Sequence, residues 1–234
     1  MEADLNRIDT ADRRYLIKSL SITALVMVLL MFPAAGTLAW AKGWIFLAVS
    51  FASFLIAIPI LARVNPEIFP ARRRIQQGTR QWDRILLGVL FPIMGAIPLV
   101  AALDSVRFHW SALPTWGVAL GYVLYLAGFG LATYAEAVNK FFEPGVRLQF
   151  DREHHVIDTG PYRVVRHPGY IAASGLLIGT ALALGSLWAL APAIFVCLLL
   201  IGRTIAEDRM LRRELSGYDA YAQRVRFKWL PGLW

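Results

Sequence analysis

The chain is poor in charged residues and nearly free of cysteine. Only 17% of its 234 residues are charged and 57% are hydrophobic, a balance too apolar for an ordinary soluble domain. The single cysteine, Cys197, lies in an apolar run and cannot form an internal disulfide. The sequence also lacks a strand–GxGxxG–helix unit and any histidine and cysteine cluster with metal-ligand spacing. These absences exclude a disulfide scaffold, a Rossmann-type nucleotide site and a metal centre of that kind.

Charged side chains are missing from several long stretches. The stretches without any lie between Lys18 and Lys42, between Lys42 and Arg63, and between Arg84 and Asp104. A hydrocarbon core of about 30 Å needs roughly 20 helical residues, so each stretch can cross a bilayer once. A soluble domain of this size has too little polar surface to cover so many apolar helices. We therefore expect an all-α, polytopic integral membrane protein.

Four spanning helices are expected first, and the expected ranges are 18–39, 43–63, 84–103 and 115–138. The last uncharged run, Pro168 to Gly202, would make a single helix of about 52 Å, which is too long for a bilayer. Gly185-Ser186 at its midpoint is a turn signal. The run therefore predicts a helical hairpin with arms at about 169–184 and 187–208.

The chain divides into an N-terminal region of transmembrane helices, 1–138, and a C-terminal region, 139–234. The second region contains a polar connector, the hairpin and a C-terminal cap. Basic residues gather in the N-terminal segment with Arg7, in the loop 64–83 and in the tail after Gly202. This asymmetry indicates a cytosolic location for those segments and for both termini. The net charge of +8 therefore requires no nucleic-acid partner.

The connector and the cap both lie on the expected cytosolic face, where they can form a pocket over the hairpin. Pro168 suits the first helical position, so the hairpin is expected to begin there. The N–H groups of Gly169, Tyr170 and Ile171 could then receive a carboxylate or a phosphate. Alternatively, Arg166 and His167 only anchor a helix end at the interface.

Two ionisable residues follow the second hairpin arm directly. Arg203 and Glu207 stand four positions apart and share one helix face. They either form an interfacial salt bridge with each other or point into the polar pocket as functional groups. The pattern alone leaves both interpretations open.

Several motifs in this region occur in order. They are Gly160-Pro-Tyr-Arg-Val-Val-Arg-His-Pro-Gly-Tyr170, Glu207-Asp-Arg-Met-Leu211, Leu215-Ser-Gly-Tyr-Asp-Ala-Tyr221 and Leu230-Pro231. With the hairpin-length run between the first two, residues 139–231 resemble the isoprenylcysteine carboxyl methyltransferase family. The same set recurs in related membrane methyltransferases that act on phospholipid amines. Two departures from the family pattern are Asp208 for its second glutamate and Leu215-Ser216 for its usual Phe-Gly.

The resemblance implies a methyltransferase that uses S-adenosylmethionine held beneath the C-terminal cap. The family's cofactor-binding positions fall on Gln149, His154, His155, Val156, Ile157, Tyr162, His167, Pro168, Gly169, Tyr170 and Glu207. The family's substrate-contacting arginine falls on Arg203. Arg203 and Glu207 are accordingly the expected catalytic residues, and no metal is expected.

The methyl acceptor is left open by these residues. A carboxylate acceptor of the isoprenylcysteine type needs only an orienting cation, for which Arg203 is the candidate. A phospholipid or other lipid amine needs a base, for which Glu207, His154 and His167 are candidates. A non-catalytic membrane scaffold is a further alternative. We expect a lipophilic substrate to enter from the bilayer between helix 115–138 and the first hairpin arm. Oligomeric state cannot be inferred from the pattern.

Overall fold

The structure is a computed structural model that describes residues 9–234. Within that range every regular element is a helix. The elements are α2 (Thr10–Ala35), α3 (Ala41–Val64), α4 (Ile68–Arg72), α5 (Gln81–Ala102), η1 (Leu103–Phe108), α6 (Thr115–Val138), η2 (Phe150–Arg152), η3 (Gly160–Arg163), α7 (Pro168–Ala183), α8 (Leu190–Glu214) and α9 (Tyr218–Arg224). The expectation that Arg7 marks the cytosolic side lies outside the described residues.

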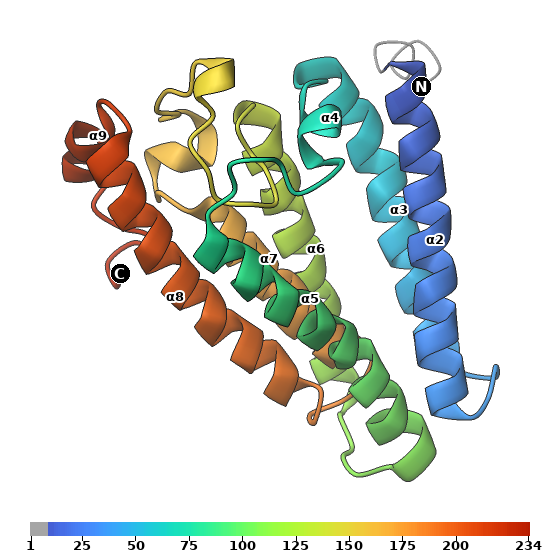
Figure 1. Cartoon of the computed structure of the whole chain (residues 1–234). Helices are drawn as coiled ribbons and strands as arrows, with labels where there is room; N and C mark the ends of the chain where they lie inside the picture. Colours follow the sequence, from blue (N-terminus) through green and yellow to red (C-terminus); the bar gives the residue numbers. More distant parts are fainter. Residues whose placement is uncertain (1–8) are drawn as a thin grey trace.

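The long helices form one bundle (Figure 1), and we call the end that holds α4, the connector (residues 139–167) and α9 the polar end. Helix α7 packs against both α6 and α8, and α5 packs against α8 and α2. Helix α4, the connector after α6, and α9 gather at the end where α2 begins (Figure 1). The opposite end holds the α2–α3 loop, η1 and the turn between α7 and α8. The chain therefore concentrates its irregular backbone at one end of the bundle.

The all-α polytopic membrane fold is confirmed. Five helices are long and apolar enough to cross a membrane: α2, α3, α5 with η1, α6 and α8. The hairpin of α7 and α8 is present, with Gly185 in its turn at a φ of +83°. Helix α7 has only 16 residues and a length of about 24 Å, short of the bilayer's hydrocarbon thickness. Among the four expected spanning helices and the two hairpin arms, α7 is therefore the short one.

Two helix boundaries differ from the expected ones. The first helix begins at Thr10 instead of about residue 18, because Asp12 pairs with Arg73 and the Tyr15 hydroxyl donates to the Arg73 carbonyl at 2.6 Å. The second hairpin arm runs over Leu190–Glu214 instead of 187–208. In both cases a polar helical turn is supported by neighbours beyond the apolar segment.

The third spanning helix also continues further than expected, through η1. Asp104, expected in an outside loop, is 0% exposed. Its carboxylate accepts the Ser111 N–H at 2.7 Å, the Ser111 hydroxyl at 2.6 Å, the Ser186 hydroxyl at 2.5 Å and the Trp188 N–H at 3.3 Å. These bonds tie the end of the helix to the hairpin turn, far from the polar end.

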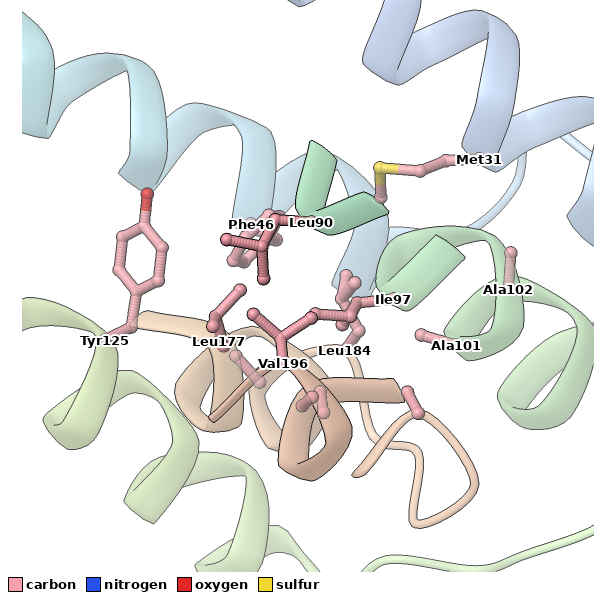
Figure 2. Packing of buried hydrophobic residues seen from close by; sticks show 14 of the residues in the cluster. Met31, Phe46, Leu90, Ile97, Ala101, Ala102, Tyr125, Leu177, Leu184 and Val196 are labelled. Atoms are coloured by element: carbon pink, nitrogen blue, oxygen red, sulfur yellow. The ribbon is translucent and has the colours of Figure 1, made fainter. Parts of the chain in front are cut away.

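The core lies where the hairpin meets the N-terminal helices. Figure 2 shows Leu177 and Val196 of the hairpin among Phe46, Leu90 and Ile97 from α3 and α5. Burial of such side chains stabilises a fold by roughly 25 cal/mol per Å² where water is the competing medium. Among lipid tails, close packing contributes most of the stability instead.

Helices α6 and α7 pack almost backbone to backbone. A side chain at Gly121 would place Cβ 2.2 Å from the Ala183 nitrogen, and one at Gly128 would place it 2.7 Å from the Ala172 oxygen. A side chain at Gly179 would come within 2.5 Å of the Tyr125 nitrogen. Small residues permit this close approach in membrane helices. The backbones of α6 and α7 are therefore in close contact at these glycines.

Candidate functional site

A cavity of about 400 Å³ occupies the polar end, between α5, the connector, the hairpin and α9. Every residue predicted for the cofactor or the acceptor lines it: Gln149, His154, His155, Val156, Ile157, Tyr162, His167, Pro168, Gly169, Tyr170, Arg203 and Glu207. The structure therefore brings residues of the connector together with the first turn of α7 and with Arg203 and Glu207 of α8. Their roles in binding remain predictions.

The first turn of α7 forms one wall of the cavity. The helix begins at Pro168, as predicted. A Cβ at Gly169 would lie 2.7 Å from the Phe142 ring, so a larger residue there would force this ring to shift. The expectation of a free N–H at Tyr170 is wrong, since this group donates to the His167 carbonyl at 3.2 Å. The helix tightens at its start and satisfies one of the donors that open helix ends usually leave unpaired.

Arg203 and Glu207 do not pair with each other in a salt bridge. The Arg203 guanidinium donates from Nε and Nη2 to both carboxylate oxygens of Asp83, at 2.6 and 2.8 Å. Nη2 also reaches the Pro144 carbonyl at 2.7 Å. Glu207 instead accepts a hydrogen bond from the Tyr170 hydroxyl. The interpretation as a self-paired interfacial salt bridge is therefore wrong.

Asp83 is a site residue that the sequence reasoning missed. It is 0% exposed and also accepts the Val146 N–H at 2.7 Å, so it joins α5, the connector and α8. The spacing between Asp83 and the apolar residues that follow it could have indicated this role. Asp83, Leu87 and Leu90 stand at i, i+4 and i+7, which places an acid on the apolar face of a helix. An acid there requires a buried partner.

Asp208 on α8 connects the hairpin to the connector and to α9, the helix of the C-terminal cap. Its carboxylate accepts Nε of Arg166 at 2.7 Å, Nε2 of His167 at 3.2 Å and the hydroxyl of Tyr218 at 3.0 Å. Burial, with the negative charge of Asp208 beside it, raises the pKa of Tyr218, which remains a phenol and a donor. Arg166 continues the connection by donating to the Val225 carbonyl at 2.6 Å. Arg166, His167 and Tyr218 also line the cavity, so this cluster helps to fix its shape.

The connector histidine His154 is neutral near pH 7. Burial, then the neighbouring charges of His155, Arg147 and Arg152, lower its pKa to about 4. Its Nδ1 accepts the backbone N–H of Gln149 at 3.3 Å. The Gln149 side chain donates to the Phe141 carbonyl at 2.7 Å. Both residues thus help to shape the connector in addition to lining the cavity.

The cavity has an apolar arm that runs along the hairpin and α5. Its lining residues are Leu87, Leu90, Phe91 and Met94 of α5, Ala173 and Leu177 of α7, and Leu200 of α8. Phe91 and Met94 are 53% and 37% exposed on the side of a membrane-spanning helix. The arm therefore reaches the lipid-facing surface at α5. The expected passage between α6 and α7 lies where glycines bring the two backbones into close contact, and it stays a prediction.

Part of the chain matches a known protein family. Residues 116–216 match the family described as phospholipid methyltransferase. No curated protein matches the chain. The matched segment contains α6, α7 and α8, and so includes the Arg166–Tyr170 segment and Glu207. It does not include Asp83 or the α5 wall of the apolar arm. Apolar spanning helices together with this match support a membrane methyltransferase of the group that includes the phospholipid methyltransferases.

Proposed function

We propose that this chain uses S-adenosylmethionine to methylate a lipophilic acceptor taken from the bilayer. The observation that carries the proposal is one cavity with two unlike ends. Polar groups around Glu207 and the first turn of α7 line one end, and the apolar arm along α5 forms the other. A charged, water-soluble donor and an apolar acceptor need these two environments. The family match supports methyl transfer as the reaction.

The residues of the polar end fit the donor. When bound, S-adenosylmethionine supplies a methyl group on a positively charged sulfonium. Glu207 forms no salt bridge among residues 9–234 and would accept hydrogen bonds from the donor's ammonium group. The residues that would hold the remainder are Gln149, His154, His155, Val156, Ile157, Tyr162, His167, Pro168, Gly169 and Tyr170.

The protein's own contribution to the reaction is positioning and exclusion of water. Methyl transfer from a sulfonium is an in-line displacement in which charge is lost, so a dry and weakly polar cavity favours it. Tyr162 and Tyr170 place aromatic surface against the cavity. The Asp208 cluster keeps the cap closed above it. No nucleophile of the protein has to react.

The acceptor group has two candidate chemistries. An isoprenylcysteine-like acceptor would present a carboxylate, with Arg203 as the orienting cation. A phospholipid or other lipid amine would present a nitrogen, and the description of the matched family favours this second chemistry. In both cases the apolar arm would receive the hydrocarbon part. A purely scaffolding protein would not need a cavity that combines a carboxylate without a salt-bridge partner with a passage to lipid.

We also propose that the polar end and both termini face the cytosol. Arg72, Arg73, Arg74 and Arg80 lie in the α3–α5 connection at this end, which agrees with the positive-inside rule. A cysteine added after Trp234 can be labelled from each side of sealed vesicles of known orientation. Labelling only from the non-cytosolic side would refute the proposed orientation.

Binding of S-adenosylmethionine to the purified protein tests the proposal. We expect Glu207→Gln to weaken binding by roughly tenfold or more in calorimetry, as for loss of a hydrogen bond to a charged group. Glu214→Gln on the same helix is the matched control, because Glu214 is exposed and pairs with Arg80 away from the cavity. Absence of binding by the wild-type protein would refute the function. Equal binding by wild type and Glu207→Gln would refute the site.

A further inference from the structure

The charges around the cavity are unevenly paired. Each arginine that lines it has a carboxylate partner, and these pairs are Arg72–Glu136 at 3.1 Å, Arg147–Glu143 at 2.7 Å, Arg166–Asp208 at 2.7 Å and Arg203–Asp83 at 2.6 Å. Within residues 9–234, Glu207 is the lining carboxylate that forms no salt bridge, although it lies within electrostatic range of Arg203. The cavity therefore offers an unpaired negative charge and no unpaired arginine.

Arg203 is the arginine placed where the apolar arm meets the polar end. Leu200 lines the arm one helical turn before it, and Glu207 follows one turn later. Asp83 occupies Nε and Nη2 of the guanidinium, and Nη1 donates no hydrogen bond among the described residues. The pair of donors that could bind the carboxylate of an acceptor at two points is already bound to Asp83.

We infer that Asp83 determines the class of methyl acceptor, by neutralising Arg203 and so favouring a lipid amine over a lipid carboxylate. This inference rests on the proposed methyl-transfer function. A carboxylate entering the arm would lose its hydration without gaining an unpaired cation, which is costly in a weakly polar site. An amine can enter as the neutral base, after releasing its proton to water. Asp83 acts through Arg203 and is a positioning residue.

The reaction with an amine balances without a further reactant. The nitrogen lone pair forms the new N–C bond while the S–C bond breaks and sulfur keeps the bonding pair. The positive charge passes from sulfur to nitrogen, and the product ammonium can release a proton to water. Nearby Glu207 stabilises positive charge at either stage.

A pair of acceptors with equal chains tests the inference. Protein in nanodiscs receives labelled methyl donor with hexadecylamine or hexadecanoic acid, and base lability separates ester from amine products. We expect the wild type to methylate the amine and its rate to rise with pH as the amine loses its proton, around pH 10. Asp83→Asn leaves Arg203 charged and without its salt-bridge partner. It is expected to raise the ratio of ester to amine product by roughly tenfold or more.

Asp104→Asn is the matched control. Asp104 is likewise 0% exposed and lies on the same continuous helix, but it is bonded to serines at the other end of the bundle. It is expected to lower stability without changing the product ratio. The double variant Asp83→Asn/Arg203→Gln removes both charges and is expected to keep the preference for the amine.

The outcomes separate the inference from the proposed function. Methylation of the acid in preference to the amine by the wild type would overturn the inference, even if Asp83→Asn cannot be purified. An unchanged product ratio in folded Asp83→Asn would overturn it as well. Failure of the wild type to bind the donor or to methylate any acceptor would instead refute the proposed function.

Discussion

Asp208 is the residue at which one substitution is expected to loosen the cap. It is 4% exposed, and its two oxygens accept two bonds from Arg166, at 2.7 and 3.1 Å, and further bonds from His167 and Tyr218. Asp208→Asn preserves the shape of the side chain but removes its charge. The new amide N–H group would face the hydrogen-bond donors of Arg166 or Tyr218. Removing one partner of a buried ion pair costs about 3–5 kcal/mol. The whole free energy of unfolding of a protein is typically about 5–15 kcal/mol.

Urea unfolding in detergent and limited proteolysis measure this effect. Arg166 donates through Nη1 to the Val225 and Arg226 carbonyls, so release of Arg166 is expected to expose the chain after α9 to protease first. Asp158→Asn is the control, because Asp158 meets Arg224 at 2.9 Å at an exposed position, where a pair is worth about 0–1 kcal/mol. A loss below about 1 kcal/mol for Asp208→Asn, or one equal to the control, would refute the assigned role.

Two further predictions concern packing and pH. Gly128→Ala is expected to destabilise the α6–α7 pair by about 1–3 kcal/mol through overpacking, whereas Gly130→Ala, where a Cβ meets nothing within 4 Å, is expected to be neutral or stabilising in thermal unfolding. Equal effects would contradict the close approach. Because the pKa of His154 is lowered to about 4, its imidazole is expected to stay neutral down to about pH 5 in NMR titration. The unfolded chain binds this proton more readily, so its contribution to stability is complete above about pH 6.5 and is lost as pH falls through about 4. Titration near pH 6.5 in the folded protein would contradict the burial of His154.

The helices were largely predictable because scarcity of charge is a local property. A stretch without charge for about 20 residues has few stable environments other than a bilayer, so the expected 115–138 and the observed Thr115–Val138 agree. The start of α7 could also be predicted from local sequence, because proline suits the first position of a helix and not its interior, and α7 begins at Pro168. Boundaries failed where polar turns are held by distant neighbours, as at Thr10, where α2 is tied to Arg73.

The sequence by itself determined that this is a helical membrane protein with a hairpin, and it named the residues that surround the cavity. Only the tertiary structure decided what those residues face. Asp83 and Arg203 are separated by 120 positions, and no pattern along the chain shows that they pair. The apolar arm along α5 also depends on which helix faces meet. Periodicity records whether a side chain is buried, but its partner is set by how the helices pack in space.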